Sequence, residues 1–107
     1  MPNNYRSIVL TVLSRHIGNG NGISMRGLEQ QVDLSARKIR VHISDLRADG
    51  HAICGTPEQG YFIAETAAEL ESTCEFLRSR AMHSLMLESK LRNIPMADLL
   101  GQLHVPT

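Results

Sequence analysis

Aromatic residues are scarce in this chain of 107 residues: they make up 4% of it, and tryptophan is absent. A buried core must therefore be aliphatic, with leucine, isoleucine, valine, methionine and alanine supplying its surface. A chain of this length forms one domain, or one domain with a helical extension. Its core is small enough for association with other chains to matter.

Cysteine is also rare, because only Cys54 and Cys74 are present. Two cysteines do not make a disulfide framework. A single bond between them is the alternative, but we expect both to be buried thiols in a reducing cytoplasm. The sequence contains no signal peptide pattern and no run of 18 or more apolar residues. These absences predict neither export nor membrane insertion, and they favour a cytoplasmic protein.

The formal net charge is zero, which excludes a chain that is basic as a whole. Charge is nevertheless unevenly distributed along it. Residues 1–64 hold seven Lys or Arg against five acids, and residues 65–107 hold four against six. This asymmetry suits a positive contact surface joined to a separate segment. We therefore predict a domain at 1–64 and a C-terminal helical extension at 65–107.

The segment from Ser35 to Gly50 predicts a short helix whose two ends are both marked by suitable residues. The Ser35 hydroxyl can accept a hydrogen bond from an otherwise unpaired backbone amide, and Gly50 can adopt the left-handed conformation that ends a helix. Ile39, Ile43 and Leu46 fall on one apolar face. The opposite face is basic, so this helix can lie against phosphates while its apolar stripe is anchored in a core.

The residues before this helix predict a second one. Segment 24–32 forms a short helix capped by Ser24, with Leu28 and Val32 buried, and residues 33–34 make a tight turn into the basic helix. A helix, a short turn and a second helix with a basic exposed face constitute the helix-turn-helix arrangement.

Two short β-prone runs follow Gly50, at 51–54 and 61–64, and they surround a Gly/Pro-containing turn at 55–60. This pattern predicts a β-hairpin. A hairpin directly after a recognition-type helix is a wing. In that arrangement Gly22–Ser24 forms a short first strand that pairs with the wing.

The spacing of eleven residues in this region is specific: Ser35, Ile39, His42, Ile43, Leu46, Arg47, Gly50, Ile53, Pro57, Gly60 and Tyr61. The pattern resembles the winged helix-turn-helix of the biotin-repressor type and covers roughly Ile8 to Ile63. The resemblance implies a winged-helix fold and a DNA-binding regulator of bacterial or phage origin. It implies a semi-buried packing role for His42. Nothing matches that family's ligase domain, so no biotin chemistry is carried over.

On this interpretation the partner is double-stranded DNA. Arg37 and Arg40 are placed to enter the major groove, where arginine grips guanine with two hydrogen bonds, while Ser35 and Lys38 are better placed for phosphates. Arg47 lies nearer the buried edge, where pairing with an acid is the alternative. The full set of candidate DNA-binding residues is Ser35, Arg37, Lys38, Arg40, Val41, Ser44, Arg47, Arg26, Thr56 and Gln59.

The tip of the predicted wing favours an alternative. It offers Glu58, which phosphate repels, and Thr56 and Gln59 can make only neutral contacts there. With the zero net charge, this feature supports a winged helix that docks onto another protein in a larger complex and reads no DNA.

A helix at residues 5–16 precedes this region, and a long one at 66–92 follows it. The first carries a stripe expected in the core: Tyr5, Ile8, Val9, Val12, Leu13 and Ile17. In the second, Thr66 and Glu69 form a capping box. Its apolar coverage is too broad for one packing face, so we expect a homodimer. The predicted dimerisation stripe is Leu70, Cys74, Leu77, Ala81 and Leu85.

Asn93–Pro95 interrupts the long helix, and a last amphipathic helix is expected from Met96 to Leu103.

Catalysis has no support, because the chain lacks a nucleophile elbow, a phosphate-binding loop and a paired-acid spacing. His51 and Cys54 are the closest pair of potential metal ligands, but a structural zinc site needs four. We therefore expect no enzyme activity, no metal and no cofactor.

Overall fold

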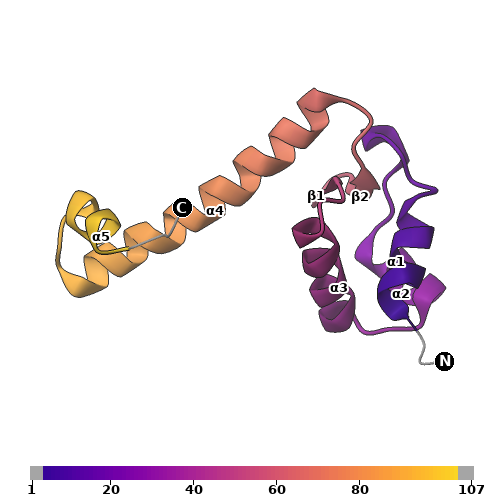
Figure 1. The fold of residues 1–107 in the computed structure, drawn as a ribbon, viewed down its shortest axis with the longest axis horizontal. Coiled ribbons are helices and arrows are strands. Elements are labelled where there is room, and N and C mark those ends of the chain that lie inside the picture. Colours follow the sequence, from indigo (N-terminus) through magenta and orange to yellow (C-terminus); the bar gives the residue numbers. More distant parts are fainter. Residues whose placement is uncertain (1–3, 104–107) are drawn as a thin grey trace. The chain divides into compact units, whose positions relative to one another are not determined.

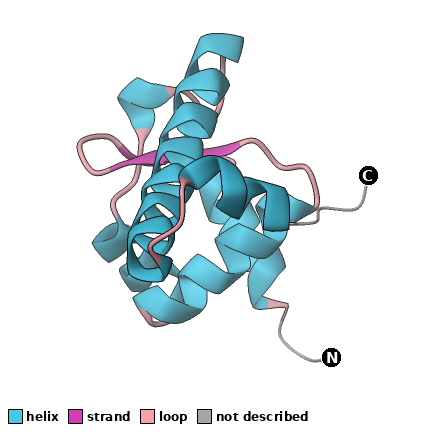
Figure 2. Ribbon diagram, turned by 90° about the vertical axis from the view of Figure 1, so that its left-hand side faces the viewer, coloured by secondary structure: helices cyan, strands magenta, loops and turns pink. Residues whose placement is uncertain are grey.

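The computed structural model describes residues 4–103 and consists of helices with one small antiparallel hairpin, as Figures 1 and 2 show. The chain divides into two compact units between Thr73 and Cys74. A mainly helical fold with a hairpin and a long C-terminal helix is therefore confirmed. The elements are α1 (Tyr5–Leu13), the 3-10 turn η1 (Asn19–Asn21), α2 (Met25–Val32), α3 (Ala36–Ala48), β1 (Ile53–Thr56), β2 (Gly60–Ile63), α4 (Ala67–Arg92) and α5 (Met96–Gln102).

The first unit buries an aliphatic core between α1, α2, α3 and the hairpin, as the shortage of aromatic residues predicts. The predicted buried faces of α2 and α3 are both confirmed. The buried residues of the main cluster are Val9, Val12, Leu13, Ile23, Leu28, Val32, Ile39, Ile43, Leu46 and Ile53. Cys54 and Phe62 of the hairpin are buried as well.

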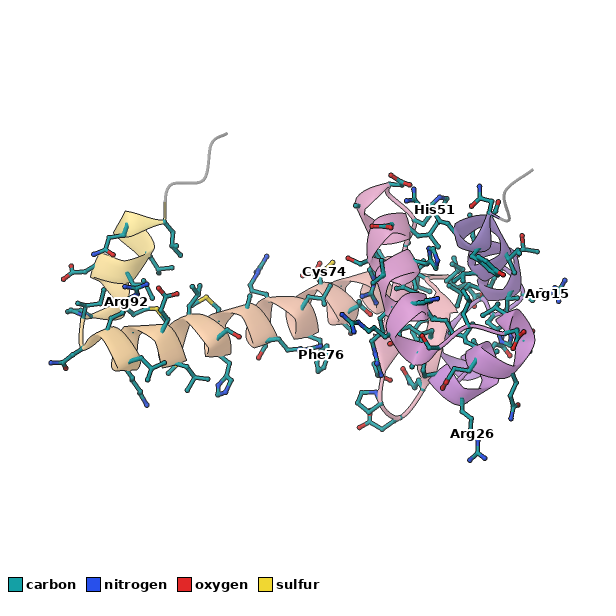
Figure 3. All side chains as sticks on the ribbon, turned by 90° about the horizontal axis from the view of Figure 1, so that it is seen from below. Arg15, Arg26, His51, Cys74, Phe76 and Arg92 are labelled. Atoms are coloured by element: carbon teal, nitrogen blue, oxygen red, sulfur yellow. The ribbon has the colours of Figure 1, made fainter. Side chains whose placement is uncertain are left out.

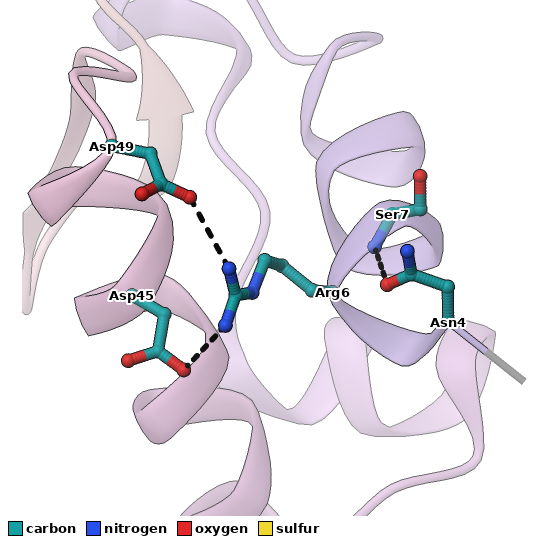
Figure 4. Close-up of polar contacts among 5 residues, drawn as sticks. All are labelled: Asn4, Arg6, Ser7, Asp45 and Asp49. Atoms are coloured by element: carbon teal, nitrogen blue, oxygen red, sulfur yellow. Dashed lines mark hydrogen bonds and ion pairs between the residues drawn. The ribbon is translucent and has the colours of Figure 1, made fainter.

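Helix α1 begins after Asn4, whose Oδ1 accepts a hydrogen bond from the Ser7 amide at 3.1 Å (Figure 4). It ends at Leu13, before the predicted end at His16. The chain then turns, and Gly18 adopts a positive φ of 88° that no continuing helix contains.

The predicted core stripe of α1 is only half right. Val9, Val12 and Leu13 are buried, but Tyr5, Ile8 and Ile17 are among the exposed large apolar residues. Tyr5 and Ile8 lie on the side of α1 that its neighbours leave uncovered. Ile17 lies beyond the end of the helix, so the helical period no longer applies to it, and its backbone forms a parallel bridge with Ile63.

The turn between α2 and α3 is defined by its caps. The Ser24 Oγ accepts from the Gly27 amide at 3.0 Å, and the Ser35 Oγ accepts from the Lys38 amide at 3.3 Å. Between them Asp33 takes the left-handed conformation, with φ 53°, and ends α2. Both predicted N-caps are confirmed, and these caps fix where α3 starts.

Strands β1 and β2 pair antiparallel, with Ile53 opposite Ile63 and Thr56 opposite Gly60. The Thr56 Oγ1 accepts a hydrogen bond from the Gln59 amide at 2.9 Å and closes the turn. The hairpin predicted after the basic helix is therefore confirmed.

The strand predicted at Gly22–Ser24 is reduced to one bridge, in which Ile23 and Tyr61 exchange two backbone hydrogen bonds of 2.8 Å. Glycines allow this close approach. A Cβ on Gly22 would lie 1.7 Å from the Gln59 carbonyl oxygen, and one on Gly60 would lie 2.5 Å from the Ile23 carbonyl oxygen. Any side chain at either position would push the segments apart.

The capping box of α4 is confirmed. The Thr66 Oγ1 accepts from the Glu69 amide at 3.2 Å, and the Glu69 Oε1 accepts from the Thr66 amide at 3.3 Å. The first turns of α4 still belong to the first unit, which reaches Thr73. Compact packing thus continues past residue 64, where the predicted domain ends.

In the second unit, Asn93 takes a positive φ of 56° and ends α4, and Pro95 precedes α5. Leu99 is 1% exposed, which confirms an apolar face on the predicted last helix. Leu100 and Leu103 of the same predicted stripe are exposed. The short α5 therefore buries Leu99 and leaves these two leucines in contact with solvent.

The two cysteines differ. Cys54 on β1 is buried, with its Sγ 3.6 Å from the Glu69 carbonyl oxygen, whereas Cys74 is exposed. The expectation that both are buried is therefore wrong for Cys74, because no described element of its own unit covers that side of α4. Across residues 4–103, no helix combines the length and the apolar character needed to cross a bilayer.

Candidate functional site

The outward face of α3 is the candidate site. Arg37, Val41 and Ser44 are exposed on the side of the helix opposite the buried Ile39 and Ile43. Val41 is 54% exposed, so an apolar side chain stands in the middle of this polar face. The predicted division of α3 into a core side and a solvent side is confirmed.

Two further cations flank this face. Lys38 and Arg40 are exposed, and together with Arg37 they make the first half of α3 positive. Within residues 4–103, no carboxylate oxygen lies within 4.0 Å of these three cationic groups. The first turn of α3 contains no acid either, so the helix N-terminus adds its own partial positive charge.

The acids of α3 are held at its other end. Arg6 of α1 reaches across to α3, where its Nη2 lies 3.2 Å from Asp45 Oδ2 and its Nη1 lies 3.2 Å from Asp49 Oδ2 (Figure 4). The single guanidinium offsets part of the charge of the two carboxylates. The negative charge at the C-terminal end of α3 is thereby reduced, and the positive first half dominates the helix.

The sequence alone does not point to Arg6 as a partner of α3. Its partners are 39 and 43 residues away along the chain, and no local spacing points to them. The sequence shows only that two acids lie at the C-terminal end of a basic helix. From this one could predict a cation on some neighbouring element, but not which one.

Arg47 differs from the other candidate DNA-binding residues. Its Nε donates a hydrogen bond to the Ile53 carbonyl oxygen at 2.8 Å, and the residue is half-buried. The guanidinium thus joins α3 to β1. The alternative of pairing with an acid is replaced by this contact with a backbone carbonyl.

The remaining candidates lie outside α3. Arg26 on α2 is exposed, and Figure 3 shows it projecting away from its helix. At the hairpin turn Gln59 is exposed and Thr56 is half-buried, with the Thr56 hydroxyl already accepting from the Gln59 amide. Glu58 is exposed between them. The turn therefore presents a carboxylate, as its sequence indicates, and no cation.

Among residues 4–103, Glu69 has a pKa that departs clearly from its ordinary value. Its carboxylate accepts from the backbone amides of Asn19 at 2.9 Å, Glu65 at 2.8 Å and Thr66 at 3.3 Å. These hydrogen bonds, that from Asn19 foremost, lower the pKa of Glu69 below its ordinary value, since they favour the charged form. The group joins η1 to the start of α4 and lies outside the α3 face, so its role is structural.

The histidines form no site in the part of the chain that is described. His42 is half-buried, as expected, and its Nδ1 is buried without a hydrogen-bond partner there. His51 and His83 are exposed. No three His, Cys, Asp or Glu side chains among residues 4–103 converge as a metal site would require.

The predicted dimerisation stripe on α4 is largely uncovered. Leu70, Cys74, Leu77 and Ala81 are exposed, whereas Leu85 is half-buried. Further large apolar residues of α4 are exposed beyond this stripe: Phe76, Met82, Met86, Leu87 and Leu91. The broad apolar coverage predicted for this helix is therefore confirmed, and most of it is exposed.

The chain matches no known protein family, no curated protein and no solved structure.

Proposed function

We propose that the first unit is a winged helix-turn-helix that binds double-stranded DNA, with α2 and α3 as the two helices and the β1–β2 hairpin as the wing. The observation that carries this proposal is the set of exposed cations Arg37, Lys38 and Arg40, which face solvent without carboxylate partners within residues 4–103. Such a face, on a helix anchored by its opposite side, suits entry into a major groove. A cytoplasmic transcription regulator of bacterial or phage origin is the corresponding role.

The division of labour follows from position. Arg37 and Arg40 reach base edges, while Lys38 and backbone N–H groups at the N-terminus of α3 contact phosphates. Ser44 lies on the same face and suits either contact. The hairpin contributes least, because Glu58 repels phosphate.

Fluorescence anisotropy with random duplex DNA at two salt concentrations tests the proposal. We expect binding that weakens as salt rises, because neutralised phosphates release counterions. Arg37→Ala and Arg40→Ala should weaken binding and relax specificity, by about 1–3 kcal/mol against the wrong base. Lys38→Ala should weaken binding to all sequences alike and lower the salt slope by about one.

Arg15→Ala is the matched control, since it also removes one exposed cation. Figure 3 shows Arg15 projecting from the side of the unit away from α3. This variant should bind DNA nearly as the wild type does. Equal losses for Arg15→Ala and Arg37→Ala would mean that binding reflects overall charge and not a recognition face.

A second function, docking onto a partner protein, is favoured by the exposed carboxylate of Glu58 at the hairpin turn. Anisotropy that stays flat at low salt with duplexes of several sequences would exclude DNA binding and leave this alternative. Glu58→Lys separates the two, because it should strengthen non-specific DNA binding if the turn approaches phosphate.

A further inference from the structure

The second unit leaves most of its apolar surface uncovered. Leu99 is its one buried apolar side chain among the described residues, whereas eight large ones are exposed: Phe76, Leu77, Met82, Met86, Leu87, Leu91, Leu100 and Leu103. Soluble chains rarely leave a large contiguous apolar surface in water. A helix with this composition therefore needs a second element against it.

One side of α4 has the spacing of a helix-pairing surface, and we call it the α4 seam. It consists of Cys74, Leu77, Ala81, Ser84 and Leu91, at steps of three and four residues with one heptad step at the end. This is the spacing at which side chains repeat along the line of contact between two packed helices. Glu88 interrupts the seam, and its Oε2 is held 2.6 Å from Arg92 Nε on the next turn.

The seam also offers a recess. A shallow groove on this side of α4 is lined by Phe76, Leu77, Ala81 and Ser84, together with the polar Ser79, Arg80 and His83. Ala81 and Ser84 are small and lie between larger side chains, so the surface is hollowed where they stand. Helix pairs seat a side chain of one helix in such a hole of the other.

Charge along α4 indicates which occupant fits. The half from Ala67 to Ser79 carries three acids and one base, and the half from Arg80 to Arg92 carries three bases and one acid. A second α4 alongside in the same direction would place acidic half against acidic half. A second α4 in the opposite direction would place each acidic half against a basic one and oppose the two helix dipoles.

We propose that α4 associates with α4 of a second copy of this chain, antiparallel, through the α4 seam. An antiparallel pair is isologous, so one self-complementary surface serves both copies and the assembly closes as a dimer. The proposal does not depend on α3, and its outcome leaves the DNA-binding proposal untouched.

The antiparallel direction makes a geometric prediction about the exposed Cys74. Cys74 and Leu91 lie about 26 Å apart along a helix that rises 1.5 Å per residue. In an antiparallel pair whose two seams overlap along their whole length, Cys74 lies near Leu91 of the second copy and far from the other Cys74. In a parallel pair the two Cys74 residues face each other, within reach of a disulfide.

Oxidation followed by non-reducing electrophoresis distinguishes these arrangements. We expect little cross-linked dimer from the wild type and a strong dimer band from Leu91→Cys. The band should disappear when Cys74→Ser is added to Leu91→Cys. Cross-linking of the wild type, together with self-cross-linking of the Cys74→Ser, Leu91→Cys double variant, would overturn the antiparallel direction.

Light scattering at micromolar concentration tests the association itself, with an expected mass twice the 11.9 kDa of one chain. Leu77→Glu should halve that mass, because position 77 would then place a second carboxylate against Glu88 of the other copy. Met86→Glu is the matched control, because Met86 is similarly exposed, 48% against 41%, and lies nine residues away, on the opposite side of α4. Circular dichroism should show unchanged helix content in both variants. A wild type that is monomeric, or equal effects of the two substitutions, would overturn the proposal.

Discussion

In the first unit twelve apolar side chains are buried and close a core, whereas in the second unit Leu99 is the single buried one among the described residues. The first unit also uses long-range polar contacts, such as Arg6 with Asp45. The ion pair of the second unit, Glu88 with Arg92, is local to one helix turn. The first unit is therefore stabilised by its own buried core, whereas the second unit leaves apolar surface exposed for another element to cover.

The exposed residues differ in kind as well. The first unit presents cations on α3, a surface suited to a charged partner. The second presents apolar residues on α4, a surface suited to a helix of similar character. One chain thus carries two contact surfaces of different chemistry, and each can be removed without the other.

The largest loss of stability is expected from a substitution in the core of the first unit. Ile43 is 2% exposed, so Ile43→Ala should lower the free energy of unfolding by about 2–5 kcal/mol, through lost burial and the cavity left behind. Urea denaturation followed by circular dichroism measures this loss.

Val41→Ala is the control on the same helix, because Val41 is 54% exposed. Its effect should stay within about 0.5 kcal/mol, as for most surface substitutions. Similar losses for the two variants would show that the buried side of α3 has been misassigned.

A smaller and more local effect is expected in the second unit. Leu99→Ala should detach α5 from the end of α4 at a cost of about 2 kcal/mol, the low end for a buried leucine, because two helices can close around the lost volume more easily than a full core can. Hydrogen exchange should accelerate for amides of residues 96–102 and stay unchanged in α3. If α3 also exchanged faster, the two units would be coupled more strongly than their separate cores indicate.

The parts of this fold that the sequence predicted are set by neighbouring residues. Ser24 and Ser35 cap their helices by accepting from an amide three residues on. The capping box of Thr66 and Glu69 has the same span. The basic face of α3 was predictable for the same reason, since helical periodicity alone separates Arg37 from the core.

The parts that were missed depend on distant residues. The Arg6 contacts span 39 and 43 residues, and the bond from Asn19 to Glu69 spans 50. No sequence period extends that far. The exposure of Tyr5 and Ile8 was missed for a related reason: helical spacing marks a face as apolar, but neighbouring elements decide how much of it they cover.

Glu69 should make the stability of the first unit depend on pH. Its pKa is lowered in the folded chain, so its contribution to stability is fully present above the unfolded pKa and is lost as pH falls through the folded one. Glu69→Gln should therefore lower the melting temperature at neutral pH, and the difference from wild type should shrink as the solution is acidified below about pH 4.

Glu71→Gln is the matched control for Glu69→Gln, since Glu71 is exposed on the same helix and makes no side-chain hydrogen bond within residues 4–103. Its melting temperature should follow that of the wild type across the acid range. A Glu69→Gln difference that stayed constant with pH would mean that the carboxylate's charge contributes nothing.

The smallest expected effect concerns Arg6, and it connects core stability with the α3 surface. Both of its ion pairs are about half exposed, at 45% for Arg6 against 44% for Asp45 and 55% for Asp49. Exposed pairs contribute about 0.2–1 kcal/mol each, so Arg6→Ala should destabilise the first unit only slightly, and less still at about 1 M salt, where charges are screened.

The two released carboxylates should make the C-terminal end of α3 more negative and weaken DNA binding at low salt, although Arg6 lies on α1. Adding Asp45→Ala and Asp49→Ala to Arg6→Ala should restore the affinity, because the repulsion then disappears together with its source. Persistent weak binding in the triple variant would show that Arg6 contacts DNA itself.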